Sequence, residues 1–144
     1  MYFNGTGDAY IPIMEGAGGA NGTLAPTIGI EGLTTNYDAE AQGGVGNSTS
    51  VRLRPNQPGQ TGYVLTKGAW VQWEIETDTG TGSNGFTKWW MDGVLVGSYT
   101  GIPYPTGGIT DAQWAPTWGG VGGPDTSVDQ YQYLDKFYAS GKAT

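Results

Sequence analysis

The chain has 144 residues, including 27 Gly, 8 Pro, 6 Trp and 9 Tyr but no Cys or His, and its formal net charge is −7. Its length predicts a single domain, residues 1–144, and its aromatic content argues against disorder, because disordered chains combine few aromatics with high charge. The composition excludes disulfides, thiolate and imidazole metal sites and the usual catalytic triads, and the negative charge disfavours nucleic acid and acidic membrane surfaces as partners.

Neither a membrane span nor an export signal is visible in the sequence. No apolar run approaches the roughly 20 residues that a membrane helix needs, so we expect no membrane insertion. The first residues, Met-Tyr-Phe-Asn-Gly, lack the basic and apolar regions of a signal peptide. Either the chain is not exported by that route, or a leader has been removed.

Short alternating or apolar segments bounded by turn residues recur along the chain, and no long window keeps a helical period without Gly or Pro. This pattern predicts an all-β domain of about 9–11 short strands with little or no helix. In chain order, the candidate strands are residues 9–13, 27–31, 50–54, 62–65, 70–77, 86–91, 94–99, 112–116 and 131–139.

The clearest local signal is Asp92-Gly93, which lies between the β-rich runs 88–91 and 94–96. A two-residue Asp-Gly connection favours a type I′ hairpin turn, because both central residues need positive φ. Residues 77–85 are a polar loop between the strands 70–77 and 86–91. Together these segments predict a three-stranded antiparallel meander.

Alternation assigns one apolar and one polar face to the central strands, as in antiparallel sheets with one wet face. The expected inward set is Val51, Leu53, Val71, Trp73, Ile75, Thr87, Trp89 and Met91. The expected outward set is Arg52, Arg54, Trp70, Gln72, Glu74, Glu76, Phe86, Lys88 and Trp90.

The meander carries a resemblance to a known family. Gly-Ala-Trp at 68–70 opens a strand, a polar loop follows, and the next strand ends in Trp-Met-Asp-Gly at 90–93. This pattern resembles the concanavalin A-like lectin/glucanase superfamily, particularly its laminin-G-like modules, and residues 133–140 resemble the closing strand of that family. The resemblance is good over residues 50–140 and poor over 1–49. It implies an antiparallel jelly-roll β-sandwich in a group of lectins, glycosidases, polysaccharide lyases and adhesion modules.

Two groups of residues are candidates for binding a glycan, which presents apolar C–H faces and many hydroxyls. If strands 51–54, 70–77 and 86–91 share a sheet, its open face carries an outward Trp among polar and charged residues: Arg52, Arg54, Gln72, Glu74, Lys88 and Trp90. A second, loop-borne cluster consists of Tyr99, Tyr104, Trp114, Trp118 and Tyr131. Other interpretations stay open, because Trp70, Trp73, Trp89 and Trp118 also suit packing, and Arg52 with Glu74 also suits a cross-strand ion pair.

The carboxylates are the candidate residues for catalysis and for metal binding. Glu74 and Glu76 lie two residues apart on one strand face, about 7 Å along the strand, which permits a glycosidase pair. The resemblance, however, implies a Glu-x-Asp-x-Glu arrangement that Trp-Glu-Ile-Glu-Thr does not contain, so no catalytic residue is predicted. The resemblance also implies a possible structural Ca²⁺, which takes oxygen ligands. The candidates are Asp8, Asp125, Asp129 and Asp135, although each of them also suits a turn cap.

These features predict a non-catalytic, lectin-like module that binds a glycan or polysaccharide. The main alternative is a structural or adhesion protein of a virus particle, such as a phage decoration or tail protein, or of a cell surface. Such a protein would pack against copies of itself or against virion proteins. A glycoside hydrolase or polysaccharide lyase of the same fold is a second alternative. We expect an extracellular or virion-surface location.

Overall fold

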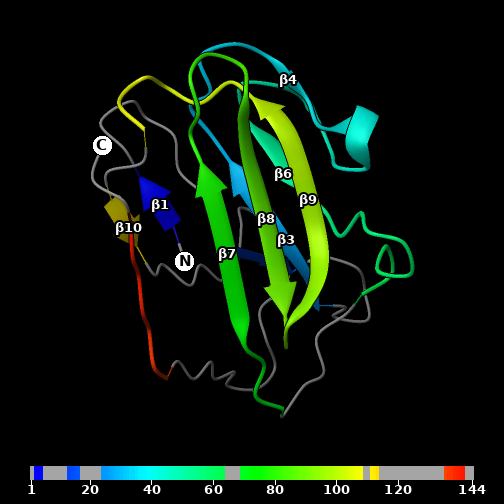
Figure 1. Ribbon diagram of the computed structural model, residues 1–144. Helices are drawn as coiled ribbons and strands as arrows, with labels where there is room; N and C mark the ends of the chain where they lie inside the picture. The colour runs from blue at the N-terminus through cyan, green and yellow to red at the C-terminus, as the bar shows by residue number, and fades with distance from the viewer. Residues whose placement is uncertain are drawn as a thin grey trace, which may run out of the picture.

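Antiparallel strands organise the chain, as the sequence predicts (Figure 1). The computed structural model describes residues 2–4, 13–16, 24–63, 69–108, 111–113 and 135–141. Within these ranges the strands are β1 (Tyr2–Asn4), β2 (Ile13–Gly16), β3 (Leu24–Ile30), β4 (Tyr37–Asp38), β5 (Asn47–Ser48), β6 (Val51–Leu53), β7 (Trp73–Asp78), β8 (Gly85–Met91), β9 (Val94–Ile102) and β10 (Asp111–Gln113). The helical content of the same ranges is one 3-10 turn, Glu40–Gln42. The all-β class is therefore confirmed.

The strands form two three-stranded sheets, β7-β8-β9 and β2-β3-β6, and two two-stranded pairs, β1-β10 and β4-β5. The β7-β8-β9 sheet is the predicted meander. Its β8–β9 hairpin turns at Asp92 and Gly93, which have φ of 49° and 78°. Gly93 supplies one left-handed position without a steric penalty, and Asp tolerates the other better than most residues do.

The placement of β6 differs from the expectation that residues 51–54 join the meander. β6 pairs with β3 and belongs to the second sheet. The partner of a strand depends on segments distant in the sequence, and the alternation within residues 51–54 carries no information about it. The faces themselves are as predicted, because Val51 and Leu53 are buried and Arg52 and Arg54 are exposed.

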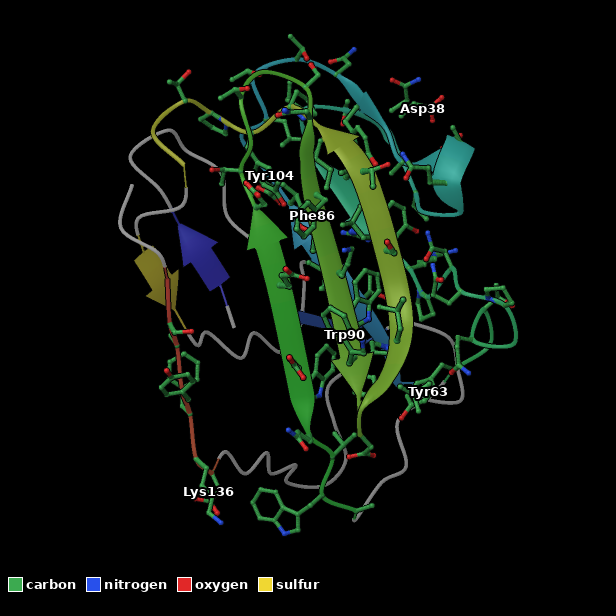
Figure 2. All side chains as sticks on the ribbon, in the orientation of Figure 1. Asp38, Tyr63, Phe86, Trp90, Tyr104 and Lys136 are labelled. Atoms are coloured by element: carbon green, nitrogen blue, oxygen red, sulfur yellow. The ribbon has the colours of Figure 1, made fainter. Side chains whose placement is uncertain are left out.

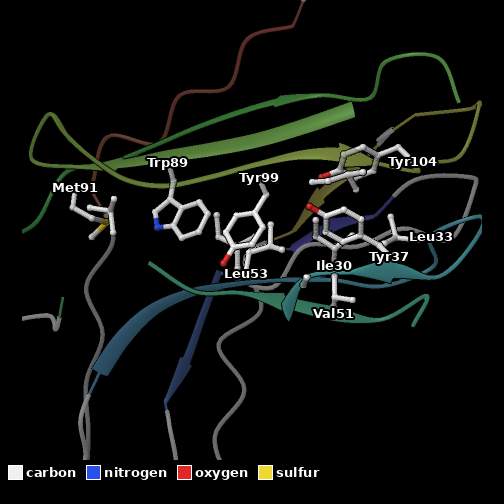
Figure 3. Close-up of a cluster of buried hydrophobic side chains, with 13 residues drawn as sticks. Ile30, Leu33, Tyr37, Val51, Leu53, Trp89, Met91, Tyr99 and Tyr104 are labelled. Carbon is white, nitrogen blue, oxygen red and sulfur yellow. The ribbon is translucent and has the colours of Figure 1, made fainter. Parts of the chain in front are cut away.

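The core lies between the two three-stranded sheets (Figure 3). Trp89 and Tyr99 enter it from β8 and β9, and their rings stack with centroids 6.0 Å apart and an interplanar angle of 8°. From the facing sheet come Ile28, Ile30 and Leu53, each with 0% exposure. The inward residues of β8 are buried and its outward residues half-buried, as the period of two requires.

Some predicted strand boundaries are wrong within the described ranges. Gly62 and Tyr63 are not in a strand, and neither are residues 135–139. The short strands β1, β4 and β5 were not predicted, because two or three residues carry too little alternation to be recognised. Residues 9–12, 64–65, 114–116 and 131–134 of the predicted strands lie outside the described ranges. Among the described residues, no helix has the length and apolarity needed to cross a membrane.

Candidate functional site

The side of the β7-β8-β9 sheet that faces away from the core is the candidate site, and we call it the outer face. β8 is the middle strand, and the register aligns each of its outward residues with an acidic residue of β7: Trp90 with Glu74, Lys88 with Glu76, and Phe86 with Asp78. The opposite neighbours on β9 are Leu95, Ser98 and Thr100. Figure 2 shows Phe86 and Trp90 along β8. Because outward residues alternate along each strand, they form one continuous surface.

A shift in register shapes one end of this face. Trp89 pairs with Gly97, whereas Trp90 pairs with Leu95, so Val96 is an extra residue in β9. Bulges of this kind re-aim the side chains beside them. As a result Val96 is buried, and half-buried Leu95 lies opposite Trp90. Strict alternation alone would place Leu95 on the side of Tyr99, so sequence reasoning missed it.

Lys88 is held at the centre of the face by two contacts. Its Nζ lies 4.5 Å from the centroid of the Phe86 ring and 3.9 Å from Oε2 of Glu76. Both contacts are with groups near the surface, so each contributes no more than about 1 kcal/mol. They nevertheless direct the ammonium group toward Phe86 and therefore along β8 away from Trp90.

Trp90 therefore has an aliphatic neighbour on one side and a carboxylate on the other. Leu95 and Glu74 are its register partners on β9 and β7. Within the described ranges, no hydrogen bond or ion pair engages the side chain of Glu74. An aromatic ring beside an available carboxylate matches a sugar, which offers both an apolar face and hydroxyl donors.

Arg52, which the sequence analysis included in this face, lies elsewhere. It belongs to β6 in the β2-β3-β6 sheet, and its side chain points outward from that layer because Val51 and Leu53 point into the core. The core therefore separates Arg52 and Arg54 from Trp90 and Glu74. The predicted sharing of one face and the alternative ion pair between Arg52 and Glu74 are both wrong.

Two residues of the predicted loop-borne cluster are core residues instead. Tyr99 is in β9 with 0% exposure, and Tyr104 has 2% exposure. The hydroxyl of Tyr104 lies 2.6 Å from Oγ1 of Thr87, and burial raises the pKa of Tyr104 above its ordinary range. Neither ring is available to a ligand. In an unbroken hairpin Tyr99 would share the outward side of Leu95, and the extra residue Val96 turns it inward, so alternation within the strand could not have indicated its position.

Of the described Trp residues expected to suit packing, one is buried, one is half-buried and one is exposed. Trp89 is fully buried, Trp73 is half-buried, and Trp70 is 71% exposed, so a core position for Trp70 is wrong. Trp114, Trp118 and Tyr131 lie outside the described residues, and their predicted roles stay predictions.

The calcium hypothesis stays a prediction as well. Asp8, Asp125 and Asp129 lie outside the described part of the chain, and Asp135 is exposed. Among the described residues there is no group of three or more His, Cys, Asp or Glu that could hold a metal ion.

Comparisons of the chain with protein-family models, curated proteins and solved structures found no match. The geometry of the outer face is therefore the basis for assigning a function.

Proposed function

We propose that the chain is a concanavalin A-like jelly-roll β-sandwich of laminin-G-like type that binds carbohydrate without catalysing a reaction. In this proposal the outer face receives a glycan or polysaccharide outside the cell or at a virion surface. Trp90 stacks on the apolar side of a sugar ring, and the Glu74 carboxylate accepts hydrogen bonds from its hydroxyls.

The position of Trp90 is the observation that carries the proposal. A half-buried Trp on the middle strand of a sheet is supported on both sides, here by Glu74 and Leu95. Such a side chain loses little conformational freedom when a ligand binds, so more of its contact energy remains as affinity. The Lys88 ammonium is directed toward Phe86 and leaves the neighbourhood of Trp90 to uncharged and acidic groups.

Screening an array of neutral and acidic glycans, followed by titration calorimetry on the best ligand, tests this proposal. We expect Trp90→Ala to weaken binding roughly thirtyfold, because truncating a Trp at the centre of a site commonly removes about 2 kcal/mol. Trp90→Phe keeps an aromatic platform and should retain most of the affinity.

Arg52→Ala is the matched control, because Arg52 lies on the other sheet and should leave glycan binding unchanged. Circular dichroism must show that each variant keeps its fold. An array without any ligand, or equal affinities for the Trp90→Ala variant and the parent chain, would contradict carbohydrate binding at this face.

A second candidate function is that of a structural or adhesion protein which packs against protein neighbours. It is supported by two adjacent exposed aromatics, Phe137 at 51% and Tyr138 at 83% exposure. Large exposed apolar side chains are common at protein interaction sites.

A further inference from the structure

The two edge strands of the β7-β8-β9 sheet, β9 and β7, differ in the hydrogen-bond partners of their outer backbone groups. At β9, the Asn56 side chain donates from Nδ2 to the Ser98 carbonyl (2.8 Å), and its Oδ1 accepts from the Ser98 N–H (2.9 Å). Gln42 bonds both backbone groups of Thr100 in the same way, at 3.0 and 3.1 Å. Two side-chain amides thus take the place of a neighbouring strand and close this edge.

The β7 edge has no such cover within the described ranges. The Asp92 N–H donates to the Gln72 carbonyl, so the backbone groups of Gln72 and of every second residue after it face β8. Those of Trp73, Ile75 and Thr77 face the opposite way, and no described strand pairs with them. The inward side chains of Trp73 and Ile75 are half-buried, whereas Trp89 and Met91 on β8 are at most 1% exposed. As far as the described residues show, this edge therefore offers both unpaired backbone and half-buried apolar side chains.

Pairing of β7 with β7 of a second copy is opposed by charge. The outward residues of β7 are the exposed Glu74, Glu76 and Asp78. An antiparallel pairing about a two-fold axis that uses the free backbone groups sets carboxylates opposite carboxylates in every register centred within residues 74–78. Like charges directly opposite each other destabilise a strand pair, so this edge requires a strand with a different charge pattern.

Residues 135–141 have the required pattern. All seven are exposed and outside any strand, and Lys136 has φ of 54°, a left-handed conformation that is unfavourable for a non-glycine residue. In an extended strand, Lys136 and Tyr138 would point to one side, and Asp135, Phe137 and Ala139 to the other. Lys136 would then lie among the carboxylates of β7, and Phe137 would extend the apolar row of Trp73 and Ile75.

We propose that residues 135–141 of one copy of this chain pair with the free edge of β7 in a second copy and form a fourth strand of its β7-β8-β9 sheet. Pairing between two copies is favoured over pairing within one molecule, because residues 135–141 lie apart from β7 of their own chain (Figure 1). Formation of the strand relieves the left-handed backbone of Lys136, buries Phe137 and supplies backbone partners to Trp73, Ile75 and Thr77. Reciprocal exchange between two copies closes a two-fold dimer.

Sedimentation velocity of the full chain over a range of concentrations tests the proposal. We expect a concentration-dependent dimer that is lost when residues 135–144 are deleted. Lys136→Glu should weaken association about fivefold, because a favourable cross-strand pair becomes a repulsive one. Arg54→Glu makes the same charge change directly after β6 of the other sheet and should leave association unchanged.

Ile75→Pro tests the β7 side of the contact. Proline removes an N–H that faces the free edge and that has no partner in the described ranges, so the monomer should stay folded while dimerisation is lost. Circular dichroism checks the fold of this variant. Retained dimerisation of folded Ile75→Pro would contradict pairing at this edge.

Disulfide trapping identifies the occupant, because the parent chain contains no Cys. One preparation carries Glu76→Cys, and the other carries Tyr138→Cys. A mixed disulfide between the two variants is expected on oxidation. A chain that remains monomeric at every concentration would overturn the proposal. So would a double variant that closes its disulfide only within one molecule, because the segment would then dock on its own sheet.

Discussion

Gly97 determines how Trp89 fits into the core. A Cβ built at Gly97 would collide with Cη2, Cζ2 and Cζ3 of the Trp89 indole, the largest fully buried side chain described. The ring thus occupies the space that a side chain at residue 97 would need. Among the described residues the indole Nε1 has no hydrogen-bond partner, so packing and the stack on Tyr99 hold this residue.

We therefore expect Gly97→Ala to lower the free energy of unfolding by about 1–3 kcal/mol, the usual effect of overpacking a core. Urea denaturation followed by tryptophan fluorescence measures this change. Gly62→Ala is the matched control, because nothing lies within 4 Å of a Cβ built there. Equal stability of the two variants would contradict the proposed role of Gly97.

Three buried tyrosines, Tyr37, Tyr99 and Tyr104, have side-chain pKa values raised above the ordinary value. Burial is the main cause that raises the pKa of Tyr37 and of Tyr99 to about 12. The Tyr37 hydroxyl donates to the Thr100 carbonyl at 2.9 Å, and the Tyr99 hydroxyl donates to the Arg54 carbonyl at 2.9 Å. Burial also raises the pKa of Tyr104. The hydrogen bonds that Tyr37 and Tyr99 donate therefore require protonated phenols.

These shifts predict alkaline destabilisation. The unfolded chain releases its phenol protons near the ordinary pKa of 10.0, whereas the folded chain retains those of Tyr37 and Tyr99 up to about 12. The stabilisation is fully present below pH 10 and is lost as the pH rises through the folded pKa. Urea denaturation at increasing pH, with tyrosinate absorbance recorded in parallel, should show this decline. A free energy of unfolding that stays constant from pH 10 to pH 12 would refute it.

At the scale of elements, Asn56 connects a loop to the edge of β9. Its Nδ2 donates to the carbonyls of Gln42 (2.9 Å) and Ser98 (2.8 Å), and its Oδ1 accepts from the Ser98 N–H (2.9 Å). The backbone N–H of Asn56 also donates to the Val96 carbonyl. This loop thereby holds the edge strand in place of a fourth strand.

Asn56→Ala should lower the free energy of unfolding by about 2 kcal/mol, because it removes several hydrogen bonds that each contribute about 1 kcal/mol. Chemical denaturation measures the loss, and light scattering reports any association through the exposed β9 edge. The neighbouring variant Gln57→Ala removes one side-chain bond, to Oδ1 of Asn56, and should have a smaller effect. If the two variants lose equal stability, the amide of Asn56 does not seal the edge.

The elements show what alternation can and cannot predict. The meander, its hairpin at Asp92-Gly93 and the inward set on β8 agree with the sequence analysis, since each depends on neighbours within a few residues. The bulge at Val96 does not follow from alternation, and it alone places Leu95 beside Trp90. Of the predicted outer face, Glu74, Lys88 and Trp90 were therefore found from sequence, and Leu95 was missed.

At the scale of the whole molecule, the two sheets decide which predicted residues can act together. Glu74, Lys88 and Trp90 share the outer face because consecutive strands carry them. Arg52 is removed from it because β6 pairs with β3, a contact between Arg52 and Gly29 that spans distant parts of the chain. The same arrangement closes the β9 edge, whereas no strand of the described ranges pairs with the β7 edge.

The sequence by itself determined the all-β class, the meander and the inward or outward position of most residues in its strands. These properties follow from a period of two and from turn chemistry, both of which act over a few residues. Tertiary structure alone decided that Tyr104 is a core residue bonded to Thr87 and that Arg52 lies across the core from Trp90. Both depend on which distant segments meet, and in this chain rich in Gly and β-branched residues, many pairings satisfy the same local pattern.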